Sequence, residues 1–164
     1  MASGDTLVVF TPLHNQPPAT AYATLDLRNS HPVLDFDAAT DEDAVFGGVL
    51  PRHYAGGGIT VTLYWAATSA TSGDCIWNAA VERIDENTLD IDADSFAAVQ
   101  AVTATAGLTN GTVDYATIAF TAGAQMDSLA VGEAFRLKIT RDANAAGDTM
   151  TGDAELLRVE VQET

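Results

Sequence analysis

Polar and apolar residues alternate along the stretch 58–85, which also contains both tryptophans of the chain. Its first half places Ile59, Val61, Leu63 and Trp65 opposite Thr60, Thr62 and Tyr64. A period of two is typical of a β-strand with one buried face. The alternation returns between residues 75 and 81, and the small residues 69–73 between the two runs have the composition of a turn. The pattern predicts two strands at the centre of an antiparallel β-sandwich, with both tryptophans in its core.

Other short strand-like segments follow, separated by residues that favour turns. They are 6–11, 21–27, 31–36, 95–105, 112–121, 133–141 and 153–161. The segment 95–105 is ambiguous because its first half could form two helical turns, whereas β-branched residues and threonines favour a strand in its second half. Asn110-Gly111 is the strongest turn signal, and the acidic run 37–43 is expected to be an exposed loop or one short helical turn. The sequence predicts an all-β fold, an antiparallel β-sandwich or jelly roll of about eight strands, with one domain over 19–164.

Prolines set the first 18 residues apart from this domain. The apolar segment 6–11 is followed by Pro12 and then by Pro17-Pro18. Because proline donates no backbone hydrogen bond, such a segment suits a sheet edge or an arm better than a central strand. We predict an N-terminal arm over 1–18 whose apolar side chains contact a neighbouring subunit. These side chains are Leu7, Val8, Val9 and Phe10. The alternative is that the segment forms a strand of its own sandwich.

The charge of the chain excludes several classes of partner. Seven basic and 23 acidic residues give a formal net charge of −16. A field of this sign repels phosphate backbones and anionic lipids, so we predict no nucleic-acid or membrane partner. The N-terminus lacks the basic region and apolar run of a signal peptide, and no apolar stretch approaches the roughly 20 residues that cross a bilayer. We expect the protein to be made in the cytoplasm and to stay soluble.

The candidate metal-binding residues do not form a complete ligand pattern. Asp90, Asp92 and Asp94 begin like a calcium loop, but Ser95 and Ala101 stand where that loop needs glycine and glutamate. We predict an exposed acidic turn over 85–94, and the sequence leaves open whether it binds a cation. The histidines are His14, His31 and His53. They are isolated from one another and have no zinc-ligand spacing. No cofactor is predicted.

Candidate catalytic residues are also few. Cys75 is the only cysteine, which rules out an internal disulfide, and its place on the apolar face beside Trp77 predicts a buried thiol. Glu82 and Asp85 could form the carboxylate pair of a glycoside hydrolase, although such pairs arise by chance in an acid-rich chain. No nucleophile elbow or phosphate-binding loop is present. We therefore predict that the protein is not an enzyme.

The second face of the central strand is neither apolar nor strongly charged. It carries Thr60, Thr62 and Tyr64, and the strand over 112–121 presents Tyr115 and Thr117 on the equivalent face. Threonine and tyrosine on such a face can be solvated. They are equally suited to a partly polar subunit interface, because tyrosine buries much area at a low entropy cost. Both interpretations stay open at this point.

Three segments resemble small virion proteins of tailed bacteriophages. They are GVLPRHYAGGGITVTLYWAATSATSGD (48–74), GEAFRLKITRDA (132–143) and DTMTGDAELLRVEV (148–161). That group has a jelly-roll fold similar to tumour-necrosis-factor domains and is usually homotrimeric. It includes capsid decoration (cement) proteins and the heads of tail fibres. The resemblance covers roughly residues 46–161 and rests on structural motifs.

The resemblance implies a homotrimer on the capsid surface of a virion, assembled in the host cytoplasm. We expect a decoration protein, because the chain has a short arm but no heptad-bearing shaft or attachment domain. Its partners would be itself and the major capsid protein, whose subunits it would bridge and stabilise. The neighbour that the arm contacts through Leu7, Val8, Val9 and Phe10 would then be a capsid subunit. The alternative is a receptor- or glycan-binding head of a tail or fibre, with Tyr22 and Tyr54 as candidate exposed aromatics at loop tips. A sandwich-fold glycan hydrolase is the third hypothesis.

Overall fold

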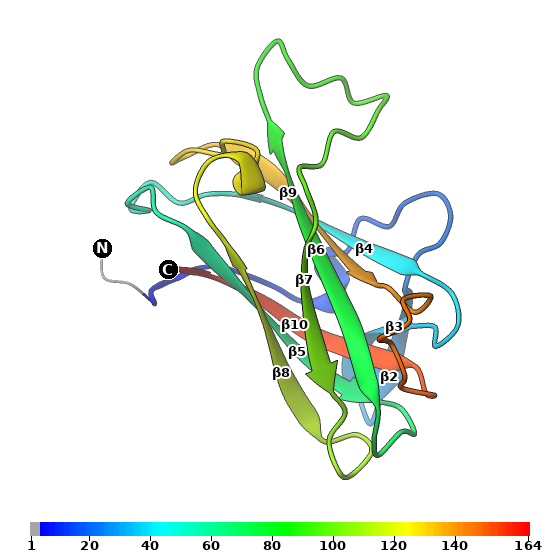
Figure 1. Ribbon diagram of the computed structural model, residues 1–164. Helices are drawn as coiled ribbons and strands as arrows, with labels where there is room; N and C mark the ends of the chain where they lie inside the picture. Colours follow the sequence, from blue (N-terminus) through cyan, green and yellow to red (C-terminus); the bar gives the residue numbers. More distant parts are fainter. Residues whose placement is uncertain (1–3) are drawn as a thin grey trace.

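Two antiparallel sheets pack face to face in the computed structural model, which describes residues 4–164 (Figure 1). The strands are β1 (Thr6–Phe10), β2 (Thr24–Arg28), β3 (His31–Phe36), β4 (Glu42–Val49), β5 (Ile59–Ala67), β6 (Asp74–Ile84), β7 (Gln100–Thr105), β8 (Val113–Phe120), β9 (Ala134–Arg141) and β10 (Ala154–Glu163). The helices are the short 3-10 turns η1 (Pro12–His14) and η2 (Ala124–Met126). The predicted antiparallel β-sandwich is confirmed.

The six-stranded sheet has the order β2-β3-β10-β5-β8, with β1 also paired to β10. The four-stranded sheet has the order β4-β9-β6-β7. One edge of β10 serves two strands, since β3 pairs with the half around Ala154–Leu156 and β1 with the half around Val159–Gln162. The other edge of β10 pairs with β5 along its whole length. Strand β10 is therefore the centre of the larger sheet.

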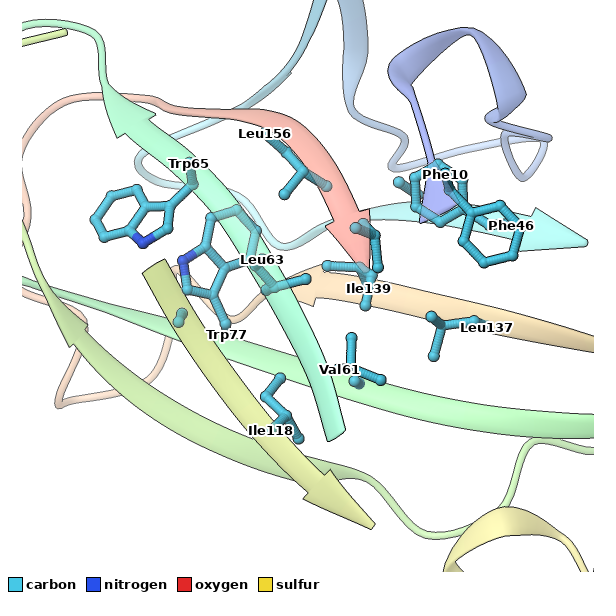
Figure 2. Close-up of a cluster of buried hydrophobic side chains, with 14 of the residues drawn as sticks. Phe10, Phe46, Val61, Leu63, Trp65, Trp77, Ile118, Leu137, Ile139 and Leu156 are labelled. Carbon is cyan, nitrogen blue, oxygen red and sulfur yellow. The ribbon is translucent and has the colours of Figure 1, made fainter. Parts of the chain in front are cut away.

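The core between the sheets contains the residues that the alternation predicted. Ile59, Val61, Leu63 and Trp65 are each at most 1% exposed. The ring of Trp65 meets that of Trp77 edge to face at 5.8 Å (Figure 2). Burial of large aromatic and aliphatic side chains is the main favourable term for a fold of this kind. Cys75 is also fully buried, as predicted, and burial raises the pKa of its thiol.

The two central strands, however, belong to different sheets. β5 lies in the six-stranded sheet and β6 in the four-stranded one, so the residues between them cross from one layer to the other. Gly73 has a φ of 95° there, and a Cβ at this position would lie 2.9 Å from the backbone of Met150. Asn110-Gly111 likewise joins β7 to β8 across the layers. The turn residues therefore predicted where the chain turns, but not whether the next strand belongs to the same sheet or to the opposite one.

The segment predicted as an arm is an edge strand of its own sheet. Val8 and Phe10 of β1 pair with Val161 and Val159 of β10. Phe10 is 4% exposed and stacks on Phe46 at 5.3 Å. Backbone pairing and the burial of this ring therefore tie residues 6–10 to the domain, and the boundary predicted at residue 18 does not separate them. Residues 1–3 of the predicted arm lie outside the described residues.

Two further segments differ from the prediction. β4 begins at Glu42, inside the acidic run predicted as a loop, because Glu42 and Asp43 pair with Arg141 and Thr140 of β9. β7 begins only at Gln100, and residues 95–99 are neither strand nor helix. None of the helices in the described part of the chain has the length and apolar character needed to cross a membrane.

Candidate functional site

The outer face of the six-stranded sheet brings together all five residues that the sequence predicted as a subunit interface. β5 and β8 are antiparallel neighbours, and Thr62 pairs with Thr117 and Tyr64 with Tyr115. Thr60 lies two residues further along the same face of β5. Directly opposed residues on one face lie close enough for their side chains to interact. The predicted set is therefore one continuous surface.

The two tyrosines on this surface differ in how their side chains are held. Their ring centroids lie 4.4 Å apart with the planes tilted by 60°. The Tyr64 hydroxyl donates a hydrogen bond to Oε2 of Glu160 at 2.8 Å, and this bond raises the pKa of Tyr64. The ring of Tyr115 is 67% exposed. Tyr64 is thus held in place by β10, while Tyr115 offers its ring to solvent.

A groove of about 460 Å³ lies beside Tyr64, and we call it the tyrosine groove. Its lining residues are Thr6, Val9, Tyr64, Val113, Leu157, Arg158 and Glu160. Glu160 accepts hydrogen bonds from the hydroxyls of both Tyr64 and Thr6, so its carboxylate is fixed at the wall of the groove. The groove combines the half-buried ring of Tyr64, a few apolar side chains and a small number of positioned polar groups, which is the composition of a ligand site. Tyr115 does not line the groove but borders it through its ring contact with Tyr64.

Sequence reasoning found only part of this groove. Tyr64 and Tyr115 were identified from the alternation of their own strands. Arg158 and Glu160 were missed, because nothing in a strand's own pattern shows that β10 pairs with β5 rather than with another strand. Of the four residues predicted to contact a capsid subunit, only Val9 reaches the outer face, where it is 44% exposed. Phe10 is buried and Leu7 and Val8 pack against the core.

The acidic side chains of the turn predicted at 85–94 form contacts within the chain. The backbone N–H of Asp92 donates to Oδ1 of Asp90 at 3.0 Å, and Asp94 forms an ion pair with Arg136 at 2.6 Å. Within residues 4–164 there is no group of three histidine, cysteine or acidic side chains that could hold a metal ion. Of the three histidines, His14 is engaged locally, since its Nδ1 accepts a hydrogen bond from the backbone of Thr11.

The carboxylate pair considered for glycoside hydrolysis has no access to a substrate. Glu82 is fully buried, and its Oε2 accepts a hydrogen bond from Arg136 at 2.5 Å. Asp85 forms an ion pair with Arg83 at 3.2 Å. A catalytic acid and its partner must both reach the scissile bond. The buried position of Glu82 excludes that role for this pair.

The tyrosines predicted at loop tips also differ from expectation. Tyr54 is 4% exposed, and its hydroxyl donates to the carbonyl oxygen of Gly57. Tyr22 is 47% exposed but lies outside the lining of the tyrosine groove. The exposed aromatic side chain beside a groove is Tyr115, which projects from the face of a sheet and not from a loop.

No protein-family model and no curated protein matches this sequence. Solved structures match the fold. The CBM22-2 xylan-binding domain from Paenibacillus barcinonensis Xyn10C is 15% identical, with 92% of each chain covered and a TM-score of 0.52. An arabinose-bound α-L-arabinofuranosidase is 10% identical over 91% of this chain, with a TM-score of 0.51, and the match covers 23% of the enzyme. The fold is thus the β-sandwich jelly roll found in carbohydrate-binding modules. The comparisons give no support to the predicted virion role.

Proposed function

We propose that this chain is a glycan-binding protein and that the tyrosine groove is its binding site. A sugar ring has an apolar face formed by its C–H groups and a rim of hydroxyls. The exposed ring of Tyr115 offers a flat apolar partner for the first, and Glu160 and Arg158 offer hydrogen-bond partners for the second. The observation that carries the proposal is Tyr115, 67% exposed beside a groove with fixed polar walls.

The polar wall of the groove is organised before any ligand arrives. Glu160 is held by the hydroxyls of Tyr64 and Thr6, which come from the two strands on either side of β10. A side chain that is already ordered loses less entropy when it binds, and this lowers the cost of association. The carboxylate retains lone pairs that can accept hydrogen bonds from sugar hydroxyls.

The likeness in fold supports this proposal by analogy. A fold hosts many functions, so the likeness to a xylan-binding domain raises the expectation of sugar binding without assigning a site. In the proposed function the chain binds glycans and has no catalytic role. It corresponds to the alternative drawn from the sequence, a glycan-binding head, rather than to the decoration protein that we expected first.

The test is binding of the purified chain to a panel of neutral and acidic glycans, followed by calorimetry on the best ligand. We expect Tyr115→Ala to weaken binding about tenfold, the equivalent of roughly 1.4 kcal/mol. Tyr22→Ala is the matched control, since Tyr22 is an exposed tyrosine that is bridged to Asp43 of the four-stranded sheet and not to Tyr64, and it should leave the affinity unchanged. A chain that binds no glycan in the panel, or a Tyr115→Ala variant that binds as tightly as the parent, overturns the proposal.

A second copy of the chain is the competing occupant of the same face. Val9 and Val113 in the groove are 44% and 43% exposed, and apolar exposure beside tyrosines also suits a subunit contact. The homotrimer therefore remains a proposal, as does attachment to a major capsid protein. Sedimentation of the parent and of Tyr115→Ala separates the two occupants. An interface at this face requires the substitution to dissociate the oligomer, whereas a glycan site leaves the mass unchanged.

A further inference from the structure

A second hollow lies next to the tyrosine groove on the outer face of the six-stranded sheet. It has a volume of about 390 Å³, and we call it the arginine hollow. Its lining residues are Arg28, Asn29, His31, Val33, Ala66, Asn110, Gly111, Val113, Glu155 and Leu157. Two of them, Val113 and Leu157, also line the tyrosine groove. The two hollows are therefore contiguous.

An irregularity in β10 forms the junction between them. The pairing of β10 with β5 shifts register between Leu156 and Arg158, so Leu157 is an extra residue in the strand. Such a bulge redirects a side chain that would otherwise follow the alternation. Leu157 is half-buried and borders both hollows. With Val113 it makes an apolar floor between two polar ends.

The far end of the arginine hollow is as well ordered as the tyrosine groove. Nη1 of Arg28 donates to Oε2 of Glu155 at 2.5 Å and to the carbonyl oxygen of Ala67 at 3.2 Å. Gly111 leaves room for this side chain, because a Cβ at residue 111 would lie 2.6 Å from Nη2 of Arg28. The Arg28 side chain is still 37% exposed. It can therefore keep its ion pair while it contacts a ligand, next to the amide of Asn110.

We propose that the two hollows form one groove for a linear glycan chain of neutral sugars, an inference that rests on the proposed function. Tyr64 and Tyr115 pair across β5 and β8, and Ala66 and Val113 pair two residues further along. Two residues of a strand span about 7 Å. A single ring stacked on Tyr115 would leave the arginine hollow empty, so a longer chain is needed to contact both ends.

The choice of a neutral chain follows from charge. The tyrosine groove is lined by Arg158 and Glu160, and the arginine hollow by the ion pair of Arg28 and Glu155. The charges within the groove therefore balance. The molecule around it has a formal net charge of −16, which opposes the approach of a polyanion. Glycans that carry carboxylates or sulfates are disfavoured at such a site, whereas neutral chains are not.

The experiment measures affinity as a function of chain length, with xylo-, cello- and manno-oligosaccharides of two to six units as probes. Of the two hollows, Asn110→Ala and His31→Ala alter the arginine hollow and leave the lining of the tyrosine groove intact. Residue 110 is suited to substitution because it is the second residue of the turn 109–112, whose positive φ falls on Gly111. Oligogalacturonates of the same lengths supply the anionic comparison.

For the parent we expect affinity to rise from the disaccharide to the longer chains. Asn110→Ala and His31→Ala should weaken binding of the hexasaccharide about three- to tenfold and leave the disaccharide unchanged. Tyr115→Ala should weaken both. Equal affinity for all lengths, or an unchanged hexasaccharide affinity in both hollow variants, overturns the extended groove while the Tyr115→Ala result still supports the proposed function. Tighter binding of oligogalacturonates overturns the neutral class, and no binding by the parent overturns the proposed function itself.

Discussion

The outer faces of the two sheets are built from similar strands but have different access to solvent. On the four-stranded sheet the connection 85–99 folds back, and the ring of Phe96 lies 4.8 Å from the guanidinium of Arg136 and 4.7 Å from the ammonium of Lys138. Ala80 and Glu82 are at most 1% exposed, although they point away from the core. On the six-stranded sheet Tyr115 is 67% exposed. One outer face is covered by its own chain and the other is open.

The difference lies in the connections and not in the strands. The segment 85–99 joins β6 to β7 and extends beyond the end of the sheet (Figure 1). Its return is tied down where the N–H of Ala97 donates to the carbonyl of Val81 at 2.8 Å. The hollows of the six-stranded sheet are lined by the strands themselves and by short connections such as 29–30 and 106–112. A long connection that packs on its sheet removes a surface, and short connections leave one available.

The largest expected effect tests whether β1 belongs to the open sheet. Phe10→Ala removes a ring that is 4% exposed and packs against Phe46 and Phe135. We expect a loss of about 3 kcal/mol in the free energy of unfolding, from the lost burial and the cavity left behind. Urea denaturation followed by tryptophan fluorescence measures it. Val9→Ala on the outer face of the same strand is the control, and it should cost less than about 1 kcal/mol. Equal effects of the two substitutions would mean that residues 6–10 are an arm and not a strand of this sandwich.

A smaller effect is expected from the carboxylates at the far end of the open face. Burial, together with the nearby charges of Asp153 and Glu155, raises the pKa of Asp35 to about 6. The usual pKa of an aspartate is about 3.9, so between about pH 4 and 6 the folded state binds more protons than the unfolded state. Stability contributed by this group is therefore complete below pH 4 and is lost as pH rises through 6.

The substitution Asp35→Asn removes the dependence of stability on pH that this carboxyl group contributes. Because Asp35 is only partly buried, we expect a gain of about 1 kcal/mol at pH 7 rather than the full value of the pKa shift. At pH 4 the variant should be no more stable than the parent. The measurement is the urea midpoint of both proteins at pH 4, 5, 6 and 7. A constant difference between them at all four values would contradict the assignment of the titration to Asp35.

The smallest effect concerns the cover on the closed face. Phe96→Ala removes the ring that lies over Arg136 and Lys138, and we expect a cost of about 1 kcal/mol, the range of partly exposed cation–π contacts. Hydrogen exchange of the amides in 85–99 should rise while that of the six-stranded sheet stays constant. Leu108→Ala is the control, since Leu108 is 92% exposed in another connection. Unchanged exchange in 85–99 would mean that the cover is held by its other contacts.

The sequence alone was sufficient for most of the strands and for their buried faces. Trp65 and Trp77 lie in the core, where the alternation placed them, and so do Ile59, Val61 and Leu63. This worked because the alternation of a half-buried strand is a local property, repeated every two residues. It failed for β4, whose glycines and acidic residues gave no such alternation.

The pairing of strands was decided only by the tertiary structure. β1 joins β10 although about 150 residues separate them, and β5 and β6 are consecutive in the chain yet lie in opposite sheets. Which strands become neighbours depends on how all apolar faces are buried together, and a single strand's pattern does not contain that information. The candidate site has the same origin. Tyr64 and Tyr115 were predictable from their own strands, whereas Glu160, Arg158 and the bulge at Leu157 joined them through the pairing of β10 with β5.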